Sequence, residues 1–431
     1  MITKVRSILE NSPLTLILVG GLAAFSAYFS MYAFRKPFLA AQFQAVDGWH
    51  IDFDFKSALI IAQVIGYTLS KFIGIKVVSE MPSEKRALSI LLLVGLSWLA
   101  LVGFAVLPAP YNLIMMLING LPLGMIWGLV FAFLEGRKST EVLTVILSAS
   151  FIIASGIMKS VGTWLMLTWG ITELWMPAIS ALIFFPLLAL SLIGLSCLPP
   201  PSIEDELART KRVPMDKCAR KQFVKENFVC LMFLIAAYVF FTALRDIRDN
   251  FTTELWQELG YGGQALIFTL SELPITLIAL VIIFAMKYVK DNYRAFFLTQ
   301  TVIIFGALLI AISTFAFESN YIDAVSWMIL SGMGLYIAYA PYGALLFDRL
   351  LAAKRFAGNA GFIIYLADSA GYAATLSILL AKYFVFDTQN WLSFYIQLSY
   401  LTAFMVCVFI VGSILLNTFS SNRFSAQQVT A

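Results

Sequence analysis

Histidine, cysteine and charged residues are scarce in this sequence of 431 residues. It contains one His and four Cys, and Asp, Glu, Lys and Arg together make up 13% of it, about half the share found in soluble globular proteins. A single histidine excludes a histidine-rich zinc cluster and a histidine relay, and the cysteines lack metal or redox spacing. No G-x4-G-K-[ST] run occurs, so ATP is not the expected energy source. We expect neither a metal site nor a cofactor.

Apolar residues are abundant instead: they make up 60% of the chain, and 15% of all residues are aromatic. A membrane-spanning helix needs about 20 apolar residues, so this content suits about twelve spans. It excludes a soluble enzyme, a disordered protein and a disulfide scaffold. The net charge of +4 is too small to indicate a nucleic-acid partner. The sequence therefore predicts an all-α, polytopic protein whose surroundings are a lipid bilayer.

Apolar stretches bounded by Pro, Gly and charged residues predict twelve membrane-spanning helices. The first six are expected near 13–40, 54–79, 87–107, 111–136, 141–168 and 174–198. The second six are expected near 227–251, 262–288, 292–317, 321–352, 356–385 and 391–419. The predicted architecture is 6+6 around a central cavity, with bundles at 1–198 and 227–431 joined by a cytoplasmic linker at 199–226 that carries a short surface helix.

The distribution of basic residues predicts the orientation of these helices. With the N-terminus inside, most Lys and Arg fall in inner loops and tails, whereas the outer loops are acidic or neutral. Basic residues stay on the cytoplasmic side, so both termini are expected on that side. The expected location of the protein is the cell's inner membrane. The first apolar run continues as a full span without a cleavage site, which indicates a first helix and not a signal peptide.

A short internal repeat supports two related halves. Residues 27–35 and 237–245 both read A-Y-x4-A-[FL]-R, at an offset of 210 residues, and each lies in the first helix of its half. Two parallel six-helix halves with the substrate site between them form the plan of major-facilitator transporters.

Polar residues inside the predicted spans are candidates for function, because a charge at the bilayer centre costs about 2.5–3.5 kcal/mol on insertion scales. Helical spacing places them on four faces. These faces are Tyr28, Tyr32 and Arg35; Gln63, Tyr67 and Lys71; Tyr238, Thr242 and Arg245; and Tyr365, Asp368 and Tyr372. A water-filled cavity that attracts anions accounts for such faces better than lipid does. Snorkelling to the membrane surface is the alternative for Arg35, Arg245 and Lys71.

Other intramembrane charges lie on different faces. Lys36 and Arg248 are expected to snorkel or to pair with Asp246 or Asp249. Lys159 is a candidate for coupling transport to a second ion, and the sequence indicates no other role for it. Glu272 precedes Pro274 in a span that the proline could break, and its alternatives are a coupling group, a paired carboxylate or a protonated one. Asp368 is the other candidate for coupling, because the helix around it is otherwise apolar.

Several of these motifs carry a resemblance to a known family. The run at 31–38, M-Y-A-F-R-K-P-F, resembles the Y-x2-R-K-x-F of the organophosphate:phosphate antiporters of the major facilitator superfamily. The run at 66–74, G-Y-T-L-S-K-F-I-G, is similar to that family's S-K-F-x2-G signature. Leu244-Arg245 with Asp249, and the segment from Tyr339 to Phe362, resemble its helix 7 and its helix 10–11 junction. The runs Y-A-F-R-K-P-F and S-K-F-I-G-I-K suggest a separate branch.

The resemblance implies that Arg35, Arg245 and Lys71 bind the substrate phosphate, as the matching residues do in that family. Guanidinium groups suit bidentate binding of phosphate or carboxylate. The sequence departs from the family at two places: the fifth span has Ser148, Ser150, Ser155 and Lys159 in place of a cavity histidine, and Asp368 stands where many members have a small residue. Both departures weaken the case for a phosphate ester.

The leading functional prediction is a secondary transporter of a small organic anion, either organophosphate or carboxylate, that works by alternating access as a monomer. Inorganic phosphate or protons are the expected counter- or co-substrates. A proton-coupled symporter of an anionic or zwitterionic solute is the close alternative, with Asp368 or Glu272 as the titrating group. A non-transporting membrane sensor ranks third. An integral-membrane enzyme ranks last, because no catalytic or nucleotide-binding motif is present.

Overall fold

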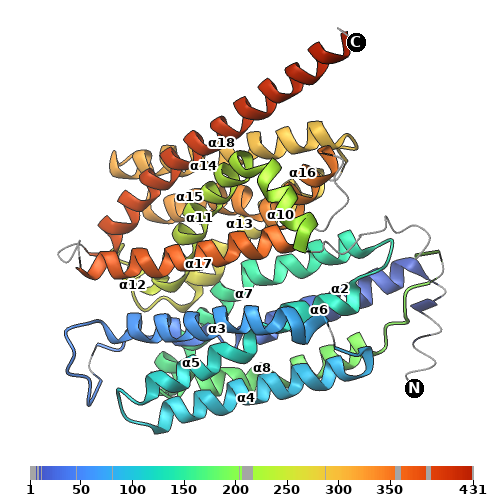
Figure 1. The fold of residues 1–431 in the computed structure, drawn as a ribbon. Helices are drawn as coiled ribbons and strands as arrows, with labels where there is room; N and C mark the ends of the chain where they lie inside the picture. Colours follow the sequence, from blue (N-terminus) through green and yellow to red (C-terminus); the bar gives the residue numbers. More distant parts are fainter. Residues whose placement is uncertain are drawn as a thin grey trace. The chain divides into compact units, whose positions relative to one another are not determined.

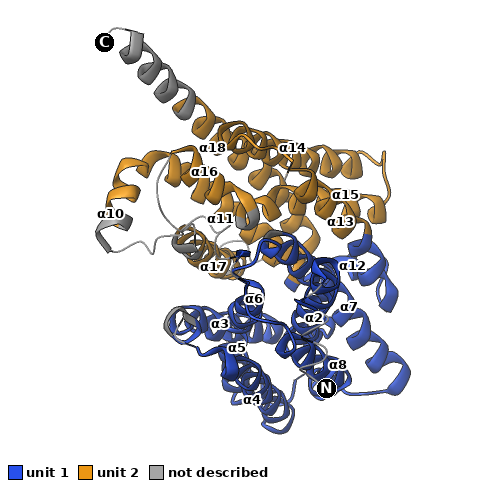
Figure 2. Ribbon diagram, turned by 90° about the vertical axis from the view of Figure 1, so that its right-hand side faces the viewer, with its two compact units in different colours: residues 1–210, 250–273 blue, residues 211–249, 274–431 orange. Residues whose placement is uncertain are grey.

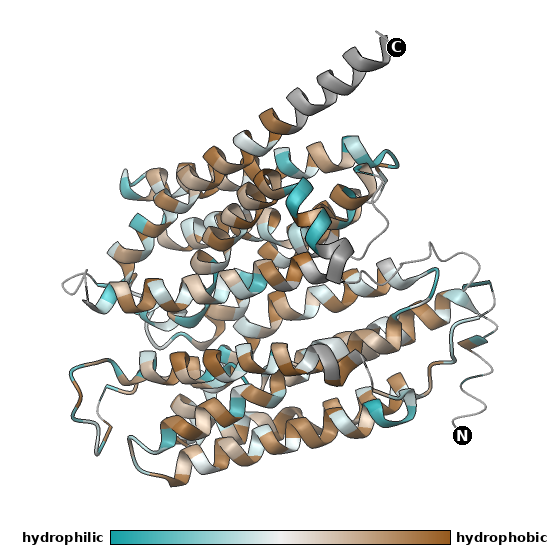
Figure 3. Cartoon of the chain, in the orientation of Figure 1, coloured by the Kyte–Doolittle hydropathy of each residue, from teal (hydrophilic) through white to brown (hydrophobic). Residues whose placement is uncertain are grey.

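The computed structural model of the chain describes residues 6, 9–10, 12–44, 46–79, 81–202, 204–205, 217–286, 288–354, 361–384 and 390–429. Throughout these residues the chain forms helices joined by turns and bends, with no strand (Figure 1). Apolar residues cover most of the length of the helices, and polar residues gather in several connecting segments (Figure 3). The predicted all-α fold is confirmed.

The long helices follow the predicted spans closely. In the first half they are α2 (Pro13–Tyr32), α3 (Phe55–Ser79), α4 (Arg86–Val106), α5 (Asn112–Leu123) with α6 (Ile126–Leu134), α7 (Thr140–Trp169) and α8 (Met176–Ser196). In the second half they are α11 (Phe228–Asn250), α13 (Ala265–Met286), α14 (Asn292–Glu318), α15 (Ala324–Pro341), α17 (Gly361–Phe384) and α18 (Trp391–Val429). Among the described residues, eleven helical segments are long and apolar enough to cross a membrane. The remaining long helix, α17, contains Asp368 and Lys382.

Three spans that the sequence predicts as single helices are interrupted. The span 13–40 leaves α-helical geometry after Tyr32 and ends in a 3₁₀ turn, η1 (Pro37–Ala40). The span 111–136 is divided into α5 and α6 just after Pro122. The span 321–352 passes through a π-helical turn, η3 (Tyr342–Leu346), before α16 (Phe347–Ala353). A proline lies at or next to each interruption, where it removes a backbone donor and crowds the preceding turn.

Proline does not interrupt every span. The predicted break at Pro274 is wrong, since α13 is continuous through it. The linker helix predicted within 199–226 is present as α10 (Lys217–Glu226). The segment 355–360, which belongs to the predicted helix 10–11 junction, lies outside the described residues, as does the side chain of Tyr365.

Contacts between residues divide the chain into two compact units (Figure 2). One contains residues 1–210 and 250–273, and the other contains 211–249 and 274–431. The division departs from the predicted bundles at 1–198 and 227–431 in one main respect, because 250–273 groups with the first unit. That segment includes α12 (Thr252–Glu258), whose polar side chains bond to residues of the first half.

Close backbone packing shapes the first unit, in which α3 lies against α5. A Cβ atom added to Gly120 would lie 2.2 Å from the carbonyl oxygen of Gln63, and one added to Gly66 would lie 2.1 Å from that of Leu117. Only glycine fits at such distances, and small residues are the usual means by which membrane helices approach each other. The two helices are therefore in backbone contact next to the polar residues of α3.

Candidate functional site

The two polar faces predicted in the first half come together around Tyr67. Tyr28 and Tyr32 on α2 are both buried, with their ring centres 5.6 Å apart. Tyr28 also interacts with Tyr67 on α3. The guanidinium carbon of Arg35, in the turn after α2, lies 3.8 Å from the centre of the Tyr67 ring. The structure thus joins residues that the sequence could only place on separate helical faces.

A second cation flanks the same ring. The ammonium nitrogen of Lys71, one turn after Tyr67, lies 5.5 Å from the ring centre. The negative face of an aromatic ring attracts cations, by about 0.5–1 kcal/mol at exposed sites and about 2 kcal/mol when water is removed. Arg35 is only 9% exposed, so the protein covers most of its side chain. We name Tyr28, Tyr32, Arg35, Tyr67 and Lys71 the first-half cluster.

In the second half, Arg245 forms an ion pair with its sequence neighbour. The Nη2 atom of Arg245 lies 2.6 Å from the Oδ1 atom of Asp246, and its Nε donates to the same oxygen at 3.1 Å. The other carboxylate oxygen of Asp246 accepts a hydrogen bond from the Thr375 hydroxyl on α17, at 3.0 Å. The sequence predicts that Lys36 and Arg248 snorkel or pair with Asp246 or Asp249, but Asp246 pairs with Arg245. Among the bonds described, Lys36 donates to Asn250 and Arg248 donates to the carbonyl of Met328.

Asp368 lies in a network of tyrosines. The hydroxyl of Tyr238 donates to Asp368 Oδ1 at 2.5 Å and is also 2.9 Å from the hydroxyl of Tyr339 on α15. The guanidinium of Arg245 donates to the Tyr339 hydroxyl, and its carbon lies 4.4 Å from the centre of that ring. We name Tyr238, Arg245, Asp246, Tyr339 and Asp368 the second-half cluster.

Close packing of α17 against α11 holds this cluster together. A Cβ added to Gly371 would lie 2.7 Å from a side-chain carbon of Thr242, so that only glycine fits there. Tyr238 and Asp368 each lie one turn before one of these two residues, and the close approach brings them within bonding distance.

Tyr339 and Asp246 are functional candidates that helical periodicity did not select. Tyr339 follows Tyr336 on α15 by three residues and precedes Tyr342 by three, and this repeated aromatic pattern was the available signal. The ring of Tyr342, at the start of the π-helical turn, lies 5.1 Å from that of Tyr238. Asp246 is adjacent to Arg245, and adjacent residues on a helix point in different directions. The long arginine side chain nevertheless folds back to reach it.

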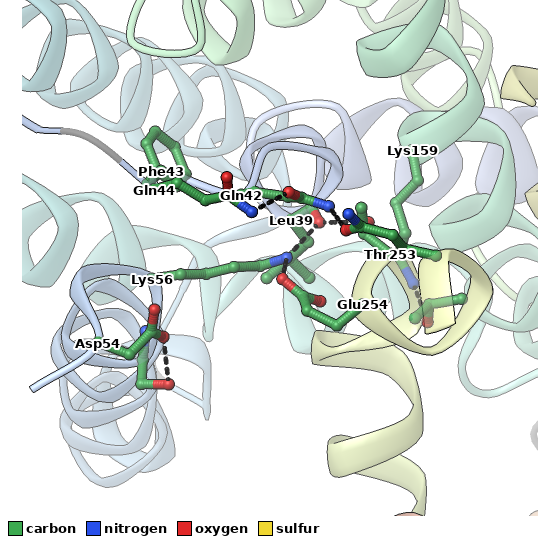
Figure 4. Close-up of polar contacts among 12 residues, drawn as sticks. Leu39, Gln42, Phe43, Gln44, Asp54, Lys56, Lys159, Thr253 and Glu254 are labelled. Atoms are coloured by element: carbon green, nitrogen blue, oxygen red, sulfur yellow. Dashed lines mark hydrogen bonds and ion pairs between the residues drawn. The ribbon is translucent and has the colours of Figure 1, made fainter. Parts of the chain in front are cut away.

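Lys159 lies in a third polar group, around α12. Its ammonium donates to the Thr252 hydroxyl at 2.9 Å. Nearby, Lys56 donates to the carbonyl of Leu39 at 2.8 Å and to the carboxylate of Glu254 at 2.6 Å (Figure 4). Burial raises the pKa of the Glu254 carboxyl, and the Lys56 ammonium acts in the opposite direction. Sequence reasoning missed this pair, because Lys56 is at a predicted helix start and Glu254 was placed in an exposed loop.

Glu272, the other candidate for coupling, lies on α13 and is buried. The Cα of Gly156 on α7 faces it closely, since an added Cβ would be 2.9 Å from the Glu272 Cγ. A polar contact joins the same two helices nearby: the hydroxyls of Ser160 on α7 and Thr269 on α13 are 2.7 Å apart. Within the described residues, no group of three His, Cys, Asp or Glu could hold a metal ion.

Comparison with known proteins places this arrangement in a wider context. A family model described as a family of unknown function, DUF5690, matches residues 37–419. No curated protein matches the chain.

Solved structures show the fold. The crystal structure of a D-xylose–proton symporter is similar with a TM-score of 0.58 and 15% identity, covering 91% of this chain and 97% of that one. A mutant of the nucleoside transporter NupG is similar with a TM-score of 0.60 and 14% identity, covering 93% and 99%. The likeness extends over nearly the whole of each chain and confirms a major-facilitator fold of membrane-spanning helices.

Proposed function

The chain belongs to the DUF5690 family, whose description assigns no substrate, and we propose that it is a secondary transporter of a small organic anion. The proposed mechanism is alternating access, in which a binding site opens to one side of the membrane at a time. The names of the two similar structures, a sugar–proton symporter and a nucleoside transporter, support transport over sensing or catalysis. The class of substrate has to be inferred from the chemistry of this chain's own residues.

The observation that carries the proposal is the pair of cations at Tyr67. Arg35 and Lys71 lie 3.8 Å and 5.5 Å from the centre of one ring. Two positive charges beside one ring attract an anion, and the attraction grows as water is excluded. The guanidinium fork of Arg35 would bind a carboxylate or phosphate through two parallel hydrogen bonds, and Lys71 would add a point charge.

The second half contributes differently in this proposal. Every nitrogen of the Arg245 guanidinium already donates a hydrogen bond, to Asp246 or to Tyr339. These bonds use three of its five N–H groups, and a substrate anion that binds the edge formed by Nε and Nη2 must compete with Asp246. We propose that Arg245 binds the anion by such an exchange, and that Tyr238 and Tyr339 offer hydroxyl groups to the rest of the substrate. Tyr28 and Tyr32 would likewise offer hydroxyl groups to the substrate beside Arg35.

Proton-coupled symport of an anionic or zwitterionic solute is the second candidate, and Asp368 favours it. Its carboxylate accepts a short hydrogen bond from Tyr238, which in turn contacts Tyr339 and thereby Arg245. Protonation of Asp368 would change the acceptor that orders this whole chain of donors. Glu272 and Lys159 are the other candidates for coupling, and inorganic phosphate remains the candidate counter-substrate for exchange.

The membrane location belongs to the proposal as well. We propose the cytoplasmic membrane, with both termini on the cytoplasmic side and the monomer as the working unit. The basic linker residues support this orientation, since positively charged loops remain in the cytoplasm.

An uptake panel in proteoliposomes tests the proposal. Purified protein would be given radiolabelled organophosphates, carboxylates, amino acids and sugars, with and without internal phosphate and with and without a pH gradient. The proposal predicts uptake of an anion that the Arg35→Lys variant fails to take up while it still inserts normally. Uptake restricted to neutral solutes would refute it.

A further inference from the structure

The backbone that carries Arg35 ends a helix in an unusual way. After Tyr32 the chain turns more tightly, and the amide of Arg35 bonds to the carbonyl three residues earlier, that of Tyr32. The amide of Lys36 donates to the same carbonyl, and Pro37, the following residue, has no amide hydrogen to donate. The last carbonyls of a helix need other partners, and no water is available for them inside a membrane. The carbonyl oxygens of Phe34 and Arg35 therefore need hydrogen-bond donors from other parts of the protein.

Two side-chain amides from other helices bind these carbonyls. The Nδ2 of Asn119, on α5, donates to the Phe34 carbonyl at 3.0 Å. The Nε2 of Gln63, on α3, donates to the Arg35 carbonyl at 3.1 Å and to the Oδ1 of Asn119 at 2.8 Å. Asn119 also donates to the hydroxyl of Ser97 on α4, at 2.7 Å. Three helices thus hold the end of α2 through one fully buried asparagine.

This arrangement has little freedom to shift. Gln63 and Asn119 lie where α3 and α5 are in backbone contact, since a Cβ on Gly120 would be 2.2 Å from the Gln63 carbonyl oxygen. Moreover, Gln63 and Tyr67 are one turn apart on α3. The first binds the Arg35 carbonyl and the second lies under the Arg35 guanidinium. One helix therefore fixes both ends of the arginine, and Asn119 fixes the glutamine.

We propose that Asn119 and Gln63 are positioning residues that set the direction in which Arg35 presents its guanidinium to the substrate. This inference rests on the proposed function of Arg35 as an anion-binding residue. The side-chain amide is needed because it both donates to a carbonyl and accepts from its neighbour. A carboxylate of the same shape accepts only and would repel the carbonyl oxygen of Phe34.

The kinetic test compares Asn119→Asp with Asn112→Asp, using exchange of radiolabelled inorganic phosphate in proteoliposomes. Asn112 is a matched control, because it is buried on the same helix and the new charge would lie in the first turn, where the helix dipole favours it. We expect Asn119→Asp to raise KM for phosphate at least tenfold with Vmax within twofold of the parent, and Asn112→Asp to leave both within twofold. Equal effects of the two variants would overturn the proposal.

A double-variant cycle distinguishes positioning from general damage. If Asn119 acts through Arg35, then Asn119→Asp should raise KM less than threefold in a protein that already carries Tyr67→Leu, which keeps transport but removes the ring that holds the Arg35 guanidinium, because coupled residues are not additive. A full tenfold effect in that background would overturn the proposal. Normal exchange by the Arg35→Lys protein, or no exchange by the parent, would instead count against the proposed function.

A thiol-labelling experiment tests the positioning role without transport. In a protein with Cys197, Cys218, Cys230 and Cys407 replaced by Ser, the Arg35→Cys variant is treated with the anionic reagent 2-sulfonatoethyl methanethiosulfonate. We expect Asn119→Asp to change the rate of modification at position 35 at least fivefold, because the turn after α2 loses its anchor. Asn112→Asp should leave the rate unchanged. The same rate in all three proteins, including no reaction in any of them, would overturn the inference.

Discussion

The guanidinium carbon of Arg35 lies 3.8 Å from the centre of the Tyr67 ring, so that the arginine is held over an aromatic face. Its counterpart in the internal repeat, Arg245, lies 4.4 Å from the centre of the Tyr339 ring. The two arginines share this stacking but differ in the next residue. Lys36 follows Arg35, whereas Asp246 follows Arg245 and pairs with it. The two clusters therefore differ in charge, and the first-half cluster is the more cationic.

Tyr67 can be tested by separating its ring from its hydroxyl. Tyr67→Phe keeps the ring under Arg35 and loses only the hydroxyl, whereas Tyr67→Leu loses both. A cation over a ring is worth about 0.5–2 kcal/mol, which corresponds to roughly a 2- to 30-fold change in affinity at about 1.4 kcal/mol per factor of ten. We expect KM for the transported anion to rise within that range for Leu and less than twofold for Phe. Equal values for Phe and Leu would contradict the stacking role.

Asp246 should stabilise the folded protein through its ion pair with Arg245. Removal of one partner of a buried ion pair costs about 3–5 kcal/mol, because the other charge is left unpaired. We expect Asp246→Asn to lower thermal stability of the purified protein strongly, and Arg245→Met to rescue part of the loss in the double variant. The control is Asp323→Asn, an exposed helix cap at the start of α15, where Asn caps about as well as Asp. An Asp246→Asn protein as stable as this control would contradict the described pairing.

Lys56 and Glu254 allow a similar comparison near α12. Lys56 is 1% exposed and donates to Glu254 at 2.6 Å. Lys56→Met alone should destabilise the protein, because Glu254 would remain buried without its cation. The double variant Lys56→Met with Glu254→Leu should be more stable than the single one, as measured by thermal unfolding in detergent. If the double variant is the less stable of the two, the pair does not behave as a buried ion pair.

Asp368 has three candidate roles that Asp368→Asn separates. Loss of a proton carrier should uncouple uptake from the pH gradient and leave exchange intact. Loss of a contact to a positive group on a zwitterionic substrate should lower affinity at every pH. Loss of a structural acceptor should reduce insertion, and Tyr238→Phe should then reproduce the defect, because its hydroxyl is the described partner of Asp368. An Asn variant with normal affinity, pH dependence and expression would exclude all three.

Hydrophobicity and helical period were sufficient to predict the helices and much of the first-half cluster. Tyr28 and Tyr32 are spaced on one face of α2, so their proximity follows from the sequence alone, whereas Arg35 lies in the turn after the helix. The break after Tyr32 was missed because apolar residues continue through Pro37 and Phe38, whereas the backbone responds to the missing amide hydrogen of the proline.

The partners of these residues on other helices could not be predicted, because periodicity within one helix carries no information about which helix it faces. Tyr339 is an example: its contacts with Tyr238 and Arg245 depend on how α15 packs beside α11. Glu254 is another, since an acidic residue in a short connection ordinarily indicates exposure. Its partner is Lys56, which lies almost 200 residues earlier in the chain.

The most direct measurement of the central claim is anion uptake by the Arg35→Lys protein beside the parent, at matched amounts of inserted protein in proteoliposomes. Lysine keeps the positive charge but loses the planar fork, so loss of uptake with normal insertion would identify bidentate binding at Arg35. Arg245→Lys is measured in parallel and should also abolish uptake, while Lys71→Ala should lower affinity only. The account predicts loss of uptake in Arg35→Lys; near-normal uptake of the anion by this variant would contradict it.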